Sequence, residues 1–370
     1  MERPQFITPA LSILLDAVRA IAALLVLGGH AVQMEIYTGP YPFGPTVQHY
    51  AVIVFFVLSG LVIAHSVRAG NYSLRDYTIA RAARILPVSL FAVAFSTAIF
   101  LVLSRQGLSP LVAPDLNNEF SLAAILLPAL FLSESGDGVG PLWNPPYWSL
   151  TYEVWFYALF GAGLFLKGTR RIIVLALLCW IAGWRVLVMT PIWLIGAGLV
   201  RYGTIWQPTK GTQAVILALT GLVIMSVSRI YAFDAQPLMF AFHAQFGYLL
   251  RFSEYALTDF VFGVGVAMLF VAFRYFAAPM EGCLRQGAPV IKWFAGFSFS
   301  LYVLHWPMLS ALSALGIGAG DNPLVFLALA GGIIGACALI AQFTEYRSRD
   351  IRKWLDRSFA KQQARPEAIG

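Results

Sequence analysis

The chain has 370 residues, of which 59% are hydrophobic and only 12% are charged, and its formal net charge is +7. Soluble domains are far less apolar, and runs long enough to cross a bilayer of about 30 Å recur along this sequence. The composition therefore excludes a soluble protein, and the excess of Lys and Arg indicates orientation in a membrane and contact with anionic lipid rather than nucleic-acid binding.

The apolar runs predict an all-α, polytopic membrane bundle, because helices satisfy their own backbone hydrogen bonds in lipid. We expect about ten membrane-spanning helices. They lie at 11–33, 47–67, 86–104, 148–166, 172–189, 190–201, 213–230, 255–276, 294–315 and 323–344. The apolar piece at 121–133 is too short to cross and predicts a re-entrant or interfacial helix.

Basic residues indicate how these spans are oriented. The loops 34–46 and 316–322 contain no Lys or Arg, whereas the alternate loops are rich in both. Because basic loops remain in the cytoplasm, we expect both termini to lie inside. Residues 1–346 then form one transmembrane domain, and residues 347–370 form a basic cytoplasmic tail.

The first span carries three ionisable residues, Asp16, Arg19 and His30, in an otherwise apolar run. Arg19 and His30 are separated by three helical turns, so they share one face and lie roughly 16 Å apart along the axis. Charged groups in hydrocarbon are costly and usually mark a cavity or a path for ions or protons. The alternative is a snorkelling Arg and a His that hydrogen-bonds a neighbouring helix.

The second and third spans carry weaker motifs. Ser59 and Gly60 permit close approach of two helix backbones, which ordinary packing also explains. Arg81 and Arg84 are three residues apart and project to one side of a helix. Paired guanidinium groups at the cytoplasmic end of a span suit binding of a phosphorylated ligand. They also suit a basic anchor that holds this end of the helix in the cytoplasm.

The span at 148–166 opens with Trp148, Ser149 and Glu153. Ser149 and Glu153 are four residues apart and share a helix face. On the orientation above, this helix begins at the outer side, where His30 also lies, so we expect the two side chains to meet. The alternative is an ion pair between Glu153 and an Arg that holds the bundle together.

The span at 294–315 contains a polar stripe, because Ser298, Tyr302 and His305 follow the i, i+4, i+7 spacing of one helix face. Such a stripe is penalised against lipid, so we expect it to face the interior of the bundle.

Together these motifs resemble the membrane acyltransferase 3 family, whose members O-acylate carbohydrates and related acceptors in bacterial envelopes. The resemblance covers nearly the whole chain. It departs from the family pattern at the end, where Glu345 is followed by Tyr346 and Arg347 rather than soon by Pro. It rests on Arg19 with His30, Phe55-Phe56 with Ser59-Gly60, Arg81 with Arg84, Trp148-Ser149-Leu150 with Glu153, and Tyr302 with His305.

The resemblance implies a multi-pass protein of the bacterial inner membrane that uses an acyl-CoA donor, usually acetyl-CoA, from the cytoplasm. It also implies an acceptor hydroxyl at the outer side, on a carbohydrate or lipid-linked glycan such as exopolysaccharide or lipopolysaccharide. We expect no metal, since the three cysteines show neither CxxC nor Cys/His spacing.

On this basis we expect His30 to act as general base on the acceptor hydroxyl. Glu153 is expected to orient His30, and Arg19 to hold the thioester or the developing negative charge. We expect the acyl-CoA to contact Arg81, Arg84, Ser59 and Gly60, and the acceptor to contact Trp148, Ser149, Ser298, Tyr302 and His305.

Three alternatives remain open at this point. A covalent acyl intermediate on His30 or a Ser is compatible with the same residues. Buried Arg, His and Glu also suit a transporter that moves a glycan or an acyl group without forming a bond, although no internal repeat is visible. A purely structural partner in polysaccharide assembly is the third, and it predicts that His30 and Glu153 are replaceable.

Overall fold

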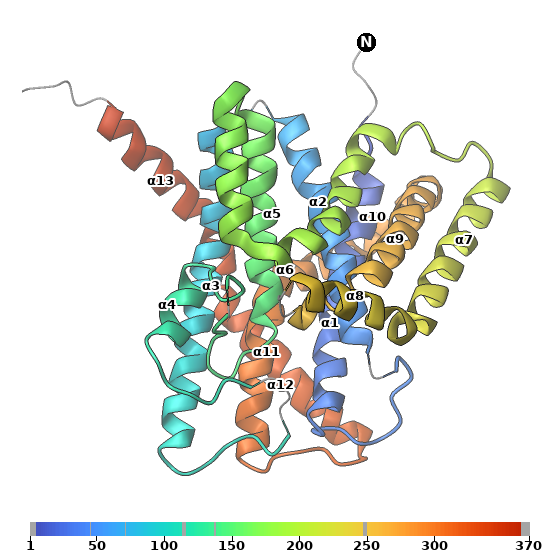
Figure 1. Cartoon of the computed structure of the whole chain (residues 1–370). Coiled ribbons are helices and arrows are strands. Elements are labelled where there is room, and N and C mark those ends of the chain that lie inside the picture. Colours follow the sequence, from blue (N-terminus) through green and yellow to red (C-terminus); the bar gives the residue numbers. More distant parts are fainter. Residues whose placement is uncertain are drawn as a thin grey trace, which may run out of the picture.

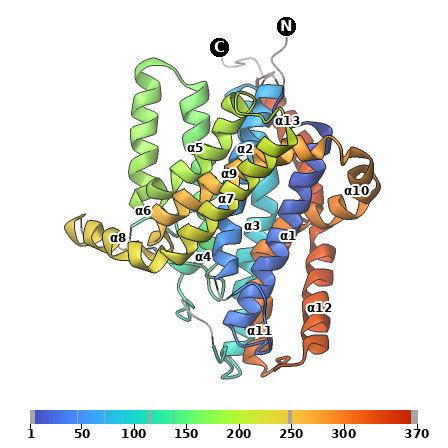
Figure 2. The same cartoon turned by 90° about the vertical axis from the view of Figure 1, so that its right-hand side faces the viewer.

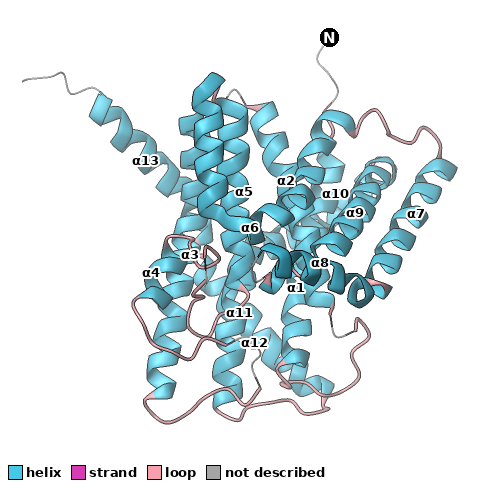
Figure 3. Ribbon diagram, viewed as in Figure 1, coloured by secondary structure: helices cyan, strands magenta, loops and turns pink. Residues whose placement is uncertain are grey.

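The computed structural model describes residues 5–44, 46–70, 72–112, 116–136, 138–246 and 250–363. Residues 364–370 of the predicted basic tail lie outside this range. The described part consists of helices joined by loops and contains no strand (Figure 3). The predicted all-α membrane fold is therefore confirmed.

The helices follow the chain in the order labelled in Figure 1. They are α1 (Pro9–Gln33), α2 (Val47–Ala69), α3 (Leu74–Ser104), α4 (Ala123–Ala129), α5 (Tyr147–Phe165), α6 (Gly168–Tyr202), α7 (Gly211–Ile230), α8 (Ala232–Phe246), α9 (Ala256–Ala277), α10 (Glu281–Gly296), α11 (Ser298–Ala314), α12 (Pro323–Ala341) and α13 (Ser348–Gln363), with 3-10 turns at η1 (Arg251–Ser253) and η2 (Glu345–Arg347).

The predicted count of ten spans is not confirmed. Among the described helices, seven are long and apolar enough to cross a membrane, or eight if the bent pair α10 and α11 is one span. Helix α5 is not one of the seven, and one side of it carries Ser149, Glu153 and Tyr157. The piece at 121–133 forms only the short helix α4.

The predicted boundary between spans at 189 and 190 is wrong. Residues 168–202 form the single element α6, which breaks at Gly183, where φ is 77° and ψ is 171°. Only glycine adopts such a conformation readily. The two halves of α6 diverge from this bend toward the same end of the bundle (Figure 1).

That end also holds the start of α1 and helix α13 (Figure 2). We call it the terminal side, and the opposite end the far side. On the far side, the loops after α1 and α11 are joined by backbone hydrogen bonds, from Thr38 N–H to Gly320 O at 2.8 Å and from Ala319 N–H to Ile36 O at 2.7 Å. These bonds fix the far-side ends of α1 and α11 relative to each other.

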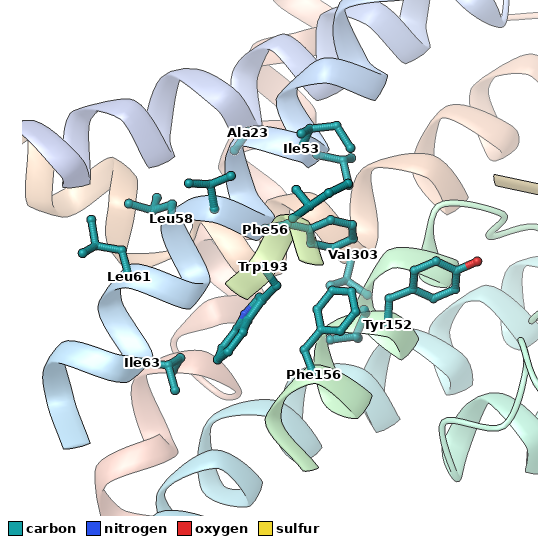
Figure 4. Packing of buried hydrophobic residues seen from close by; sticks show 14 of the residues in the cluster. Ala23, Ile53, Phe56, Leu58, Leu61, Ile63, Tyr152, Phe156, Trp193 and Val303 are labelled. Atoms are coloured by element: carbon teal, nitrogen blue, oxygen red, sulfur yellow. The ribbon is translucent and has the colours of Figure 1, made fainter. Parts of the chain in front are cut away.

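Glycine brings α2 and α6 into backbone contact at the centre of the bundle. A Cβ atom added at Gly60 would lie 2.0 Å from the carbonyl oxygen of Trp193, and one at Gly196 would lie 1.9 Å from that of Val57. Beside this crossing, the rings of Phe56, Phe156 and Trp193 pack together (Figure 4). Small residues at helix crossings are a principal source of stability in membrane bundles.

We therefore expect Gly60→Ala to destabilise the bundle by about 2–3 kcal/mol, because the new methyl group overpacks a backbone contact. Thermal unfolding of the detergent-purified protein measures this loss. Gly198→Ala on α6 is the matched control, since a Cβ at Gly198 meets no atom within 4 Å. Equal stability of the two variants would contradict the prediction.

Candidate active site

Three adjoining cavities lie along α1 in the described part of the bundle. The terminal-side cavity is lined by residues that include Asp16 and His65. The central cavity shares Arg19, Val62 and Arg84 with it. The far-side cavity shares Val52 and Tyr302 with the central cavity, and its other lining residues are His30, Gln33, Gln48, His49, Pro145, Pro146, Trp148, Phe252 and Trp306.

His30 lies in the last turn of α1, is 9% exposed and lines the far-side cavity. Its Nδ1 lies 2.7 Å from Nε2 of His305, with the two rings parallel to within 3°. On the other side of His305, Nδ1 lies 3.0 Å from the carbonyl oxygen of Leu301. A carbonyl oxygen only accepts hydrogen bonds, so Nδ1 of His305 carries the hydrogen.

This chain of contacts fixes the tautomer of His30. Nε2 of neutral His305 has a lone pair and accepts the hydrogen bond that Nδ1–H of His30 donates. Nε2 of His30 is left with its own lone pair and makes no hydrogen bond with a described residue. The arrangement leaves His30 able to take a proton from a group in the far-side cavity.

His305 was predicted to contact the acceptor, but the structure places it behind the cavity wall. It is fully buried and lines none of the three cavities. Because it hydrogen-bonds His30, His305 supports that residue rather than lining a binding surface. A side-chain contact holds the same helix: Pro307 has no N–H for the carbonyl oxygen of Val303, and Asn144 donates a hydrogen bond to that oxygen at 3.0 Å.

Glu153 lies in the central cavity, with partners other than the predicted one. Its Oε1 accepts hydrogen bonds from the hydroxyl groups of Ser59 and Tyr157, and Trp193 Nε1 donates to Ser59 Oγ at 3.2 Å. Among the described residues, no hydrogen bond joins Glu153 to His30. The predicted contact is corrected: Glu153 orders hydroxyl groups of the central cavity.

Of the predicted arginine pair, Arg84 lines two of these three cavities and Arg81 lines none of them. Arg84 shares the central and terminal-side cavities with Arg19, whose Nη1 donates to Asp16 Oδ1 at 3.1 Å. Arg81 instead lies over the ring of Tyr157, 6.0 Å from its centroid. Arg19 and Arg84, from different helices, therefore share these two cavities.

The residues predicted to contact the acceptor divide between two cavities. Trp148 and Tyr302 line the far-side cavity, whereas Ser149 and Ser298 line the central one. The hydroxyl groups of Ser149 and Tyr302 are hydrogen-bonded to each other. Tyr302, which lines both cavities, thus stands at their junction.

Ser59 and Gly60 were both predicted to contact acyl-CoA, but they have different surroundings. Ser59 lines the central cavity. Gly60 lines none of the three and instead contacts the backbone of α6. Its role in this structure is packing.

Glu345 has a clear structural partner despite its departure from the family pattern. Its Oε2 accepts hydrogen bonds from both the backbone N–H and the hydroxyl of Ser300, each at 3.0 Å. A carboxylate at this position satisfies a free N–H in the first turn of a helix. Glu345 thereby anchors the start of α11, the helix that carries Tyr302 and His305.

Sequence reasoning missed two pairings, His30 with His305 and His49 with Asp259. The first joins residues 275 positions apart, and the second joins residues 210 positions apart. Both depend on which helices are neighbours, and helical periodicity carries no such information.

Comparison with known proteins agrees with the motifs. The model of a family described as "Acyltransferase domain" matches residues 13–342. "Protein 2 in picA locus" of Rhizobium radiobacter is 33% identical over 179 residues, which cover 44% of this chain and 88% of that protein. No solved structure matches the chain. Because the family match spans most of its length, the chain belongs to the acyltransferase 3 family and is a membrane acyltransferase.

Proposed function

We propose that the protein transfers an acyl group, acetyl in the first instance, from cytoplasmic acyl-CoA to a hydroxyl of an envelope or exported glycan across the bacterial inner membrane. The observation that supports this most is the row of adjoining cavities, with Arg19 and Arg84 at one end and His30 at the other. A donor from one side and an acceptor from the other can meet in such a row.

The terminal side suits the donor. Lys167 lies between α5 and α6, and Arg170 and Arg171 lie in the first turn of α6 at this end. Basic segments mark the cytoplasmic face. Arginine presents a planar fork of donors that matches phosphate oxygens. Arg19 and Arg84 are therefore the residues we assign to CoA, and the thioester arm extends through the central cavity toward Tyr302.

The far side suits the acceptor. Nε2 of His30 takes the proton of the hydroxyl as its oxygen attacks the thioester carbonyl. The new C–O bond forms, the C–S bond breaks, and the CoA thiolate leaves and takes the proton from the imidazolium. Arg19 lies roughly 16 Å from His30 along the helix, so its role is to bind CoA rather than to stabilise charge at the carbonyl.

Purified protein tests the proposal directly. Radiolabelled acetyl-CoA is supplied together with glycan that was extracted from a strain lacking the gene and O-deacylated with mild base. We expect label to appear in alkali-labile esters of the glycan. Label that remains on CoA while glycan or acyl-CoA crosses the membrane of sealed vesicles would instead establish the transporter alternative.

We expect Arg84→Gln to raise the KM for acetyl-CoA about tenfold with little change in kcat, because it removes a charge-assisted hydrogen bond to the donor. Initial rates at varied acetyl-CoA measure this. Arg170→Gln, an exposed residue at the start of α6, is the control and keeps the wild-type KM. A fall in kcat alone would contradict the assignment of Arg84 to donor binding.

A further inference from the structure

A second histidine lines the far-side cavity beside His30. His49 lies in the first turn of α2, and its Nε2 is 2.8 Å from Oδ1 of Asp259 in the first turn of α9. Asp259 is fully buried, and its other carboxylate oxygen has no hydrogen-bond partner among the described residues. Burying a carboxylate with one oxygen unpaired is costly, and an ionisable pair inside a span indicates function.

The carboxylate sets the tautomer of His49. Asp259 as a carboxylate only accepts, so Nε2 of His49 carries the hydrogen. Nδ1 makes no hydrogen bond with a described residue, and it is not enclosed by protein, since the side chain of His49 is 22% exposed. A neutral His49 therefore offers Nδ1 as a hydrogen-bond acceptor in the far-side cavity.

The cavity thus contains two imidazoles whose tautomers are fixed by different partners. Transfer of an acyl group from a thioester to a hydroxyl moves one proton from that hydroxyl to the leaving thiolate, so one imidazole suffices as base. His30 and its partner His305 lie on the α11 side, where Tyr302 joins the donor path. His49 instead lies against Tyr255 and Asp259 at the start of α9.

We propose that His49, held by Asp259, accepts a hydrogen bond from a second hydroxyl of the acceptor while His30 takes the proton of the first. His49 is then a specificity residue that selects acceptors with two neighbouring hydroxyl groups over mono-alcohols. The indole rings of Trp148 and Trp306 and the amide of Gln33 complete a lining suited to a sugar ring. This inference rests on the proposed function and extends it to the acceptor.

The test separates binding from chemistry. Rates of acetyl transfer are measured with varied O-deacylated glycan at saturating acetyl-CoA. We expect His49→Phe, which keeps the ring shape and removes both nitrogens, to raise the acceptor KM about tenfold with kcat within a factor of two. His49→Asn, whose amide oxygen replaces Nδ1, recovers most of the affinity. An unchanged KM, or a lost kcat at unchanged KM, overturns the proposal.

Asp259 provides a second variant. Asp259→Asn keeps an oxygen that accepts from Nε2 of His49, so we expect a KM near wild type, whereas Asp259→Leu reproduces His49→Phe. Tyr231→Phe, at an exposed position at the end of α7, is the control and leaves both constants unchanged. Equal behaviour of Asp259→Leu and the wild type overturns the role of the pair.

A donor-free measurement distinguishes this inference from the proposed function. Trp148 and Trp306 line the cavity, so their fluorescence reports binding of the same O-deacylated glycan without acetyl-CoA. We expect about tenfold weaker binding by His49→Phe. If the wild type binds glycan more tightly than His49→Phe yet transfers no acetyl, the proposed function fails while the contact between His49 and the glycan stands. If both proteins bind equally, the inference fails.

Discussion

Replacing His30 with alanine is expected to lower acetyl transfer about a thousandfold, because it removes the proposed general base from the far-side cavity, and such bases contribute 10²–10⁴-fold. The loss is expected to fall on kcat, since the groups that we assign to donor and acceptor binding are unchanged. It is measured with purified protein and O-deacylated glycan, and in cells as the ester content of the envelope glycan.

The control for His30→Ala is Ile21→Ala, a change on the same helix at a position that is 55% exposed. We expect it to keep full activity, so that any loss in His30→Ala is not a general effect of altering α1. Membrane levels of both variants are compared by immunoblot. Retention of a tenth or more of the wild-type rate at normal levels would exclude His30 as the base.

The faces on which several candidate site residues lie were predictable along single helices. The spacing of Arg19 and His30 fixes their common face by helix geometry alone, and the structure places them in the terminal-side and far-side cavities, respectively. The stripe of Ser298, Tyr302 and His305 faces inward as its periodicity requires. This part of the candidate site was therefore predictable from the periodicity of single helices.

Contacts between helices were not predictable in the same way. Glu153 lies in the second turn of α5 and Asp259 in the first turn of α9, yet Asp259 pairs with a histidine and Glu153 pairs with hydroxyl groups. The depth at which each carboxylate lies depends on how α5 and α9 are shifted relative to α1 and α2. Single-helix periodicity does not encode that shift, so the partner assigned to His30 was wrong.

The glycine and proline residues predicted helix contacts and helix breaks only in part. Gly60 was recognised as a site of close approach, and the structure identifies α6 as the helix that approaches. The break of α6 lies at Gly183 rather than before Pro191, although both residues interrupt helices. The choice follows from φ at Gly183, which no other residue type adopts without strain.

The second large effect is expected for His305→Phe, which keeps a ring of similar shape and removes the acceptor for Nδ1–H of His30. Without this partner the His30 ring can rotate or change tautomer, and loss of such a supporting contact typically costs 10–100-fold. We expect kcat to fall about 100-fold with both KM values unchanged. His305→Gln, whose amide oxygen accepts the same hydrogen bond, should recover most of the rate.

The comparison of these two variants separates positioning from mere packing. Diethyl pyrocarbonate modifies the ring nitrogen of histidine that carries the lone pair. The rate at which the reagent inactivates each variant therefore reports how much of His30 has the lone pair of Nε2 exposed to the cavity. We expect slow inactivation of His305→Phe and near wild-type inactivation of His305→Gln. If the two variants lose activity equally while both unfold at the wild-type temperature, His305 does not act through the hydrogen bond to His30.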